Sequence, residues 1–154
     1  MSSRVASLIS SGLGSGYAPK APGTFGTVAA AVAWLGMSRC GLLSSSLTHL
    51  VCAVVAILLG TIAIRFSLDG GSSKDPQWIV VDEWAGLFVA LIGTDAGVLW
   101  QVALAVVLFR IFDISKIGPI SSAERLPGAV GIMADDLVAG GFALLGMIAA
   151  RYVV

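Results

Sequence analysis

The chain has 154 residues, of which 57% are apolar and only 12% are charged. Soluble domains average about 45–50% apolar and about 25% charged residues, so the composition excludes an ordinary soluble domain and indicates one integral-membrane domain, residues 1–154. The formal net charge is zero and no basic tract occurs, so the charge pattern gives no indication of nucleic-acid binding.

The first distinctive stretch is GLGSGYAPKAPGTFGT, residues 12–27, which is rich in glycine and proline. This composition predicts a loop, because it favours neither a helix nor a strand. Backbone N–H groups of such a loop can bind a phosphate, and Lys20, Thr24 and Thr27 could add a positive charge and two hydroxyl groups. A plain N-terminal turn is equally compatible with the pattern, since the P-loop motif GxxxxGK[ST] is absent.

Five apolar runs follow, and they predict an all-α membrane helix bundle of about five helices. The runs cover residues 28–37, 47–64, 84–92, 98–109 and 137–154. A helix that spans the bilayer needs about 20 apolar residues, so we expect two or more of these helices to be short or tilted. Small residues in the last run, among them Gly140 and Gly141, predict close packing against a neighbouring helix.

The polar stretches between these runs alternate between the two sides of the membrane. Five helices place residues 12–27, 65–83 and 110–136 on the same side. The cations on that side are Arg4, Lys20, Arg65, Lys74, Arg110, Lys116 and Arg125. The opposite side has only Arg39 and Arg151. The positive-inside rule therefore predicts that the crowded side is cytoplasmic, and the three polar stretches are expected to converge at that membrane surface.

Acidic residues are concentrated on the same side. They are Asp82, Glu83, Asp113, Asp135 and Asp136. A hard cation such as Mg²⁺ prefers carboxylate oxygens, so each acid is a candidate metal ligand or water-positioning base. Adjacent acids point about 100° apart on a helix, so each pair is expected to divide metal and hydrogen-bonding roles. Asp135 and Asp136 also precede an apolar run, and acids stabilise the dipole at a helix N-terminus, so plain capping is an alternative for this pair.

Arg110, Asp113 and Lys116 follow one another at i, i+3 steps, which places them on one face of a helix. A guanidinium or ammonium group at such a site can hold an anionic oxygen, typically that of a phosphate. Arg110 and Lys116 are therefore candidate phosphate clamps, and the same role is open to Lys20. Anchoring at the membrane interface is the alternative for each cation.

The residues that nucleophilic phosphatases and hydrolases require are missing. Cys40 and Cys52 lack the Cys-x5-Arg pattern of a cysteine phosphatase, and a histidine-based lipid phosphatase needs at least two histidines, whereas His49 is the only one. No G-x-S-x-G motif occurs. The remaining set of carboxylates, arginine and lysine suits metal-assisted attack on a phosphoryl group. The alternative is a small membrane transporter or cation-binding protein that uses the same carboxylates as an ion site.

Four motifs, in one order along most of the chain, resemble a known family. They are APGTFGT (21–27), IVVDEWAG (79–86), FRIFDISK (109–116) and GIMADDLVAGG (131–141). Together they resemble the phosphatidylglycerophosphatase A family. The resemblance implies a Mg²⁺-dependent lipid phosphatase of the bacterial inner membrane that converts phosphatidylglycerophosphate to phosphatidylglycerol and inorganic phosphate. On this interpretation Asp113, Asp136, Glu83 and Arg110 are the expected catalytic residues, at a site that faces the cytoplasm.

Overall fold

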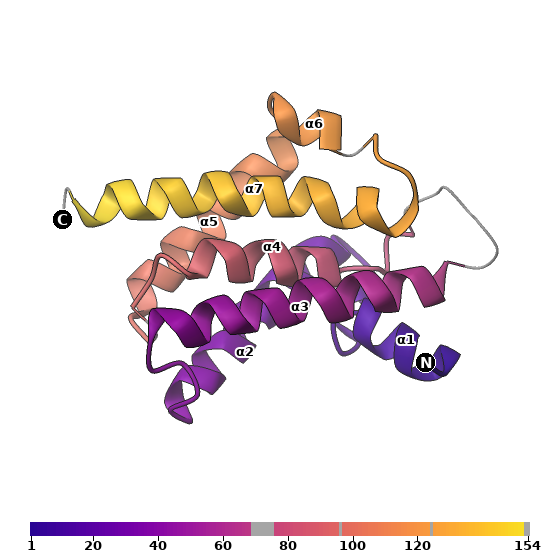
Figure 1. Cartoon of the computed structure of the whole chain (residues 1–154), viewed down its shortest axis with the longest axis horizontal. Coiled ribbons are helices and arrows are strands. Elements are labelled where there is room, and N and C mark those ends of the chain that lie inside the picture. The colour runs from indigo at the N-terminus through magenta and orange to yellow at the C-terminus, as the bar shows by residue number, and fades with distance from the viewer. Residues whose placement is uncertain (69–75, 96, 124, 153–154) are drawn as a thin grey trace.

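The computed structural model describes residues 1–68, 76–95, 97–123 and 125–152, and these residues form an all-α bundle (Figure 1). In chain order the elements are α1 (Ser3–Ser10), a 3₁₀-helix (Ser15–Tyr17), α2 (Pro22–Arg39), α3 (Ser46–Ser67), α4 (Val81–Leu91), α5 (Leu99–Ser115), α6 (Pro119–Ala123) and α7 (Gly128–Arg151). The predicted all-α class is therefore confirmed. Lys74, one of the cations of the crowded side, lies outside the described residues.

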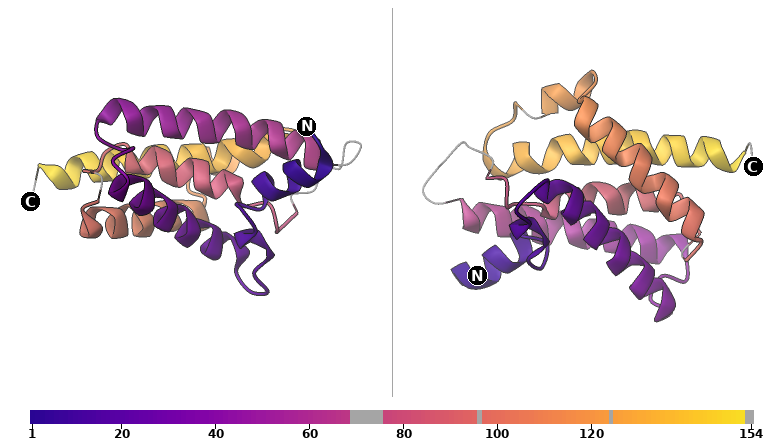
Figure 2. Two further views of the ribbon diagram at one scale, coloured as in Figure 1. Left: turned by 90° about the horizontal axis from the view of Figure 1, so that it is seen from below. Right: turned by 180° about the vertical axis from the view of Figure 1, so that it is seen from behind.

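The five longest helices, α2, α3, α4, α5 and α7, correspond to the five predicted apolar runs. They alternate in direction through the bundle, and α5 crosses α7 obliquely (Figures 1 and 2). The N-terminus and the C-terminal end of α7 consequently lie at opposite ends of the molecule (Figure 1). This arrangement agrees with an odd number of passes.

Two short helices, α1 and α6, are absent from the sequence prediction, and with them the described residues contain seven α-helices. α1 begins after Ser2, whose hydroxyl accepts a hydrogen bond from the Val5 N–H, and it packs against α3. At this contact the hydroxyl oxygens of Ser10 and Ser67 lie 3.0 Å apart. Helices of eight and five residues are too short to show a helical period, which needs a window of about 11–18 residues.

α2 begins at Pro22, so the prediction of a loop through residue 27 is wrong for residues 22–27. Proline is accepted in the first turn of a helix because its missing N–H would have no partner there. The glycine that follows serves close packing: a Cβ atom on Gly23 would lie 2.3 Å from a carboxylate oxygen of Glu83. The glycines and prolines that indicate a loop here belong to a helix that approaches α4 closely.

α7 begins at Gly128, nine residues before the predicted start at residue 137. Asp135 and Asp136 therefore lie about two turns inside the helix, and the capping alternative for this pair is wrong. The early start depends on close packing at Gly131, where a Cβ atom would lie only 1.8 Å from the Leu126 carbonyl oxygen. The glycine thus lets the first turns of α7 fold against the chain that precedes them.

α4 is the central helix and packs against α2, α3, α5 and α7. Its Leu87 and Leu91 side chains are fully buried. They share a core cluster with Trp34 of α2, Phe109 of α5 and Met147 of α7. Because the helices around it bury its surface, α4 can be shorter than a full membrane span, and its 11 residues fit that position.

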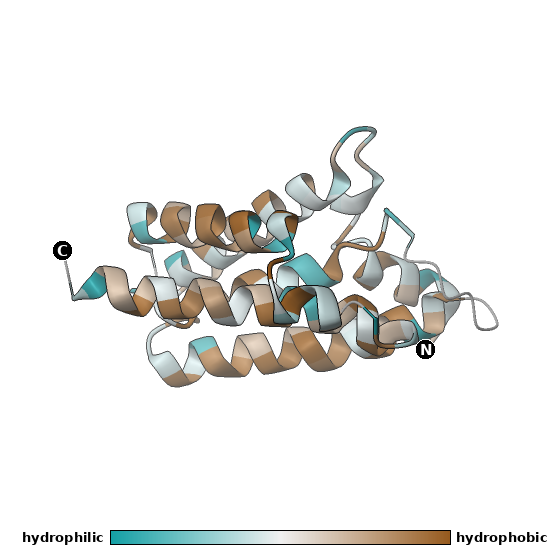
Figure 3. Cartoon of the chain, turned by 90° about the horizontal axis from the view of Figure 1, so that it is seen from above, coloured by the Kyte–Doolittle hydropathy of each residue, from teal (hydrophilic) through white to brown (hydrophobic). Residues whose placement is uncertain are grey.

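Two of the described helices, α3 and α7, are long and apolar enough to cross a membrane, with mean hydropathies of 2.5 and 1.7 over 18 residues. Only 28% and 39% of these windows are buried inside the molecule, whereas the core helix of a soluble protein is mostly buried. Figure 3 shows apolar residues along the length of the long helices, and Leu58 of α3 and Leu145 of α7 are among those that are exposed on the outer surface. Outer surfaces of this kind are suited to contact with lipid.

Candidate active site

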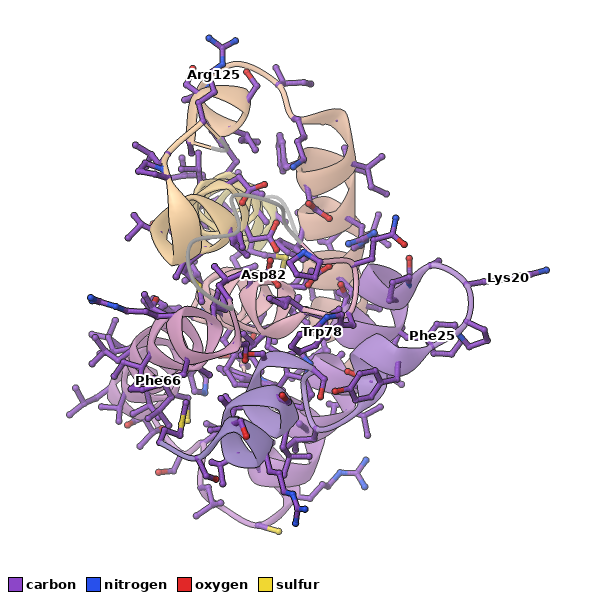
Figure 4. The ribbon with its side chains drawn as sticks, turned by 90° about the vertical axis from the view of Figure 1, so that its right-hand side faces the viewer. Lys20, Phe25, Phe66, Trp78, Asp82 and Arg125 are labelled. Atoms are coloured by element: carbon purple, nitrogen blue, oxygen red, sulfur yellow. The ribbon has the colours of Figure 1, made fainter. Side chains whose placement is uncertain are left out.

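The predicted acids meet where the first turn of α4 lies beside α7. Asp82 and Glu83 come from α4 and Asp136 from α7, and one carboxylate oxygen of each lies within 4.8 Å of the other two. Asp82 and Asp136 are only 6% and 4% exposed, and Figure 4 shows Asp82 in the interior of the bundle. We call these three residues the acidic cluster.

A close crossing of α4 and α7 assembles the acidic cluster. The two helices run in the same direction (Figure 1) and touch at Gly86 and Gly140, where a Cβ atom on Gly140 would lie 2.2 Å from the Gly86 carbonyl oxygen. Asp82 precedes Gly86 by four residues, and Asp136 precedes Gly140 by four. Residues four apart share a helix face, so the two carboxylates stand one turn before the contact, facing each other.

Glu83 carries the clearest sign that the acidic cluster needs a cation. Its Oε2 atom is buried and accepts no hydrogen bond from the described part of the chain. A buried carboxylate oxygen without a hydrogen bond is costly, and the three carboxylates of the cluster offer the oxygen ligands that Mg²⁺ prefers. The residues present therefore fit a hard divalent cation.

Arg110 and Asp113 of α5 stand next to the acidic cluster. Arg110 Nη1 donates a hydrogen bond to Asp113 Oδ2 over 2.5 Å, and Nη2 donates to Thr24 Oγ1 over 3.4 Å. Asp113 is also close enough to Asp136 for the two carboxylates to interact electrostatically. The Arg110 side chain is 20% exposed, so this guanidinium group lies between the buried carboxylates and the surface. The contact agrees with the prediction that Arg110 and Asp113 share one helix face, whereas Lys116 lies just past the last residue of α5, in a left-handed conformation.

Lys116 and Asp135 form a second ion pair at the same end of the bundle. Lys116 Nζ donates to Asp135 Oδ2 over 2.7 Å. The adjacent acids of α7 thus point to different partners, Asp135 to Lys116 and Asp136 to the acidic cluster, as the angle between neighbours on a helix requires.

The structure does not bring every predicted phosphate contact to the acidic cluster. Thr24 lies in the first turn of α2 and reaches Arg110. Thr27 is fully buried, and its hydroxyl donates to the Gly23 carbonyl oxygen over 2.9 Å. Lys20 lies on the loop before α2 and points outward, away from the bundle (Figure 4). Of these three residues, Thr24 is the one with a hydrogen bond to another predicted site residue in the described part of the chain.

Gly23 and Gly86 are positioning residues that are absent from the predicted set. A Cβ atom on Gly23 would lie 2.3 Å from Glu83 Oε1 and 3.5 Å from Arg110 Nη1, so the missing side chain leaves room between the carboxylate and the guanidinium group. The sequence does hold a signal for the helix crossing: DEWAG (82–86) and DLVAG (136–140) share the pattern Asp-x-x-Ala-Gly. Each copy places an acid one turn before a glycine contact.

The sequence model of the family described as phosphatidylglycerophosphatase A matches residues 8–151 of the chain. The chain belongs to this family. Phosphatidylglycerophosphatase A of Haemophilus influenzae is 35% identical over 94% of this chain and 88% of its own length. The protein of the same name from Escherichia coli is 35% identical over 86% of this chain and 76% of its own length. A Bacteroides thetaiotaomicron relative named putative phosphatidylinositol-3-phosphatase is 34% identical over 96% of this chain and 94% of its own length.

Membership of the phosphatidylglycerophosphatase A family confirms the resemblance seen in the four motifs and makes the chain a lipid phosphatase of that family. The matched span contains the acidic cluster, both ion pairs and the glycine crossing. The names of the relatives agree on a phosphatase and differ in the lipid. No solved structure matches the chain.

Proposed function

We propose that the protein is a Mg²⁺-dependent phosphatase that converts phosphatidylglycerophosphate to phosphatidylglycerol and inorganic phosphate at the cytoplasmic surface of a bacterial inner membrane. The observation that carries the proposal is the acidic cluster, three buried carboxylates within 4.8 Å of one another, with the partly exposed Arg110 beside it. A phosphate monoester needs both a cation and a guanidinium group to neutralise its oxygens. Family membership favours this enzyme over a transporter or a cation-binding protein.

In this proposal Asp82, Glu83 and Asp136 hold the metal ion. When bound, Mg²⁺ supplies positive charge against the phosphoryl oxygens, which lowers the cost of charge that develops during transfer. Arg110 donates hydrogen bonds to a phosphoryl oxygen, and its contacts to Asp113 and Thr24 hold the guanidinium group in place.

Asp113 is the candidate to accept a proton from the attacking water. Its carboxylate bonds to Arg110 and interacts electrostatically with Asp136, so a water molecule at this carboxylate would be close to both the metal ligands and the phosphate clamp. Lys116 orients Asp135 through their ion pair and is a second candidate clamp. Lys20 lies further out, where it could meet a lipid headgroup at the membrane surface, whereas the buried Thr27 supports the first turns of α2.

A second candidate substrate is phosphatidylinositol 3-phosphate. The observation that favours it is the relative named putative phosphatidylinositol-3-phosphatase, which matches this chain over nearly its whole length. Both lipids are phosphate monoesters, so the same acidic cluster and Arg110 suit either one. The headgroup that carries the phosphate is what differs.

The charge distribution supports an orientation with the acidic cluster facing the cytoplasm. In the predicted topology most of the described cations lie on the same side as the acidic cluster; they are Arg4, Arg65, Arg110, Lys116 and Arg125. Arg39 and Arg151 lie at the opposite end of the bundle, where α2 and α7 end. By the positive-inside rule, the end that carries the acidic cluster is cytoplasmic in this proposal.

The test is phosphate release by the purified protein in detergent, with phosphatidylglycerophosphate and phosphatidylinositol 3-phosphate as parallel substrates. We expect release from phosphatidylglycerophosphate with Mg²⁺, loss of release on chelation and recovery when Mg²⁺ is added back. Asp95→Asn is the matched control, because Asp95 pairs with Arg151 far from the acidic cluster, and it should behave as the wild type. Full activity after exhaustive chelation would overturn the metal role, and release from only the inositol lipid would overturn the proposed substrate.

A further inference from the structure

The outer face of α5 carries an apolar groove beside the acidic cluster. Its volume is about 500 Å³, and it is lined by Val106, Val107, Arg110, Ile111, Ile114 and Ser115. These positions recur at steps of three and four residues along α5, which places them on one face of the helix. Arg110 is the one charged residue among them.

The apolar groove is open to the surroundings of the molecule. Val107, Ile111 and Ile114 are 53%, 54% and 70% exposed, so no described residue covers them. Apolar surface of this extent requires a partner other than water. α3 also exposes apolar residues to the surroundings, but the groove on α5 differs because a cation of the candidate active site forms part of its wall.

Arg110 connects the groove with the site. Its side chain lines the groove, while its guanidinium group bonds to Asp113 and Thr24 at the edge of the acidic cluster. Arginine commonly places its aliphatic stem along apolar surface and its charged end in a polar environment. A ligand that lies in the groove can therefore reach the guanidinium group, which is the one charged group in the groove wall.

We infer that the groove on α5 binds an acyl chain of the lipid substrate and so sets a requirement for a long-chain lipid. This inference rests on the proposed phosphatase function. The anionic headgroup of such a lipid would meet the Arg110 guanidinium group, and its acyl chain would lie against the apolar wall of Val107, Ile111 and Ile114. The groove selects for the chain, and the acidic cluster with Arg110 acts on the phosphate.

The first test fills the groove with Val107→Trp and, separately, Ile111→Trp. Both side chains are more than half exposed, so the larger residue does not disturb the core. The substrates are dioleoyl and dibutanoyl phosphatidylglycerophosphate. We expect kcat/KM for the dioleoyl lipid to fall roughly tenfold, the effect of displacing about two methylene groups from the groove, and kcat/KM for the dibutanoyl lipid to stay unchanged. Leu58→Trp on α3, where Leu58 is 58% exposed, is the matched control and should affect neither substrate.

The inference would be overturned if the groove variants lowered kcat/KM equally for both lipids, or if Leu58→Trp lowered kcat/KM as much as the groove variants do. A second measurement does not depend on turnover. A diacyl phosphatidic acid with a photoreactive group in one acyl chain is cross-linked to the wild-type protein in detergent, and the labelled peptides are identified by mass spectrometry. Stronger labelling of α5 than of α3, together with weaker labelling of α5 in Val107→Trp, supports the groove. Equal labelling of both helices overturns it, and so do dimers cross-linked through α5. If the wild type hydrolyses neither substrate but α5 is labelled, the proposed function fails and the lipid-binding groove stands.

Discussion

Replacement of Gly140 by alanine tests whether the crossing of α4 and α7 builds the metal site. The new Cβ atom would lie 2.2 Å from the Gly86 carbonyl oxygen and 2.9 Å from its carbon. Non-bonded atoms pack at about 3.5 Å, so the two helices must separate by about 1 Å at this point. Asp82 and Asp136 lie one turn before the contact and should move apart with it. A displacement of about 1 Å at a reacting centre can lower a rate about 100-fold, and we expect a loss of this order in phosphate release.

The stability change should be moderate, so that activity is lost from folded protein. Overpacking of a core costs about 1–3 kcal/mol, and the better helix propensity of alanine offsets up to about 1 kcal/mol of it. Gly141→Ala is the matched control, since among the described residues no atom outside the local backbone of α7 and the two neighbouring residues lies within 4 Å of a Cβ atom at that position. It should keep full activity and leave the free energy of unfolding unchanged or slightly higher. Thermal unfolding in detergent and phosphate release at saturating Mg²⁺ measure the two effects side by side.

The reasoning would be refuted if Gly140→Ala retained the turnover of Gly141→Ala. The acidic cluster would then not depend on the distance between α4 and α7. A loss of activity that higher Mg²⁺ fully restores would instead show that the crossing sets the affinity for the metal ion and not the geometry of the reaction.

The remaining predictions concern charge and topology. Asp136→Asn should lower phosphate release by orders of magnitude in folded protein, whereas near-normal turnover would remove Asp136 from the metal site. Mg²⁺ at 100 times its Kd should raise the free energy of unfolding of the wild type by about 2.7 kcal/mol, and Asp136→Asn should abolish this shift in thermal melts with and without a chelator. Arg110→Lys keeps the charge but loses the simultaneous contact of the guanidinium group to Asp113 and Thr24. We expect kcat/KM to fall roughly 10- to 100-fold, because one charged hydrogen bond contributes about 1.5–3 kcal/mol. An unchanged kcat/KM would make Arg110 an interfacial anchor. A tag at the N-terminus should be cytoplasmic and one after residue 154 periplasmic, and both tags on one side would contradict the five-pass topology.

The sequence was sufficient to identify the five long helices and the acids because both depend on local signals. Apolar runs of nine or more residues mark the five long helices, and charged residues are scarce enough that Asp82, Glu83, Asp113 and Asp136 stand out. The starts of α2 and α7 could not be predicted in the same way. Their glycines and prolines indicate a loop locally, but packing against α4 and against Leu126 stabilises a helix there.

The assembly of the acidic cluster depends on contacts between residues far apart in the chain. Asp82 and Asp136 are separated by more than fifty positions, and no period along the sequence measures the distance between two helices. The repeated pattern Asp-x-x-Ala-Gly is the part of this information that the sequence does carry. Ala85 and Ala139 are both fully buried, so each copy supplies a small residue and a glycine for the crossing and an acid for the site.

The depth of the acidic cluster bears on how a lipid reaches it. From Asp136 to Arg151, α7 rises about 22 Å, whereas the apolar layer of a bilayer is about 30 Å thick. If Arg151 marks the boundary of that layer on one side, the acidic cluster lies several ångströms short of the boundary on the other side. A headgroup phosphate must then move inward to reach the carboxylates, and the partly exposed Arg110, which belongs to both the groove and the site, lies on its path. A lipid whose acyl chain lies along α5 can make this movement without leaving the membrane. A soluble phosphate ester would have to enter the apolar layer from water. The geometry therefore favours a lipid as the substrate.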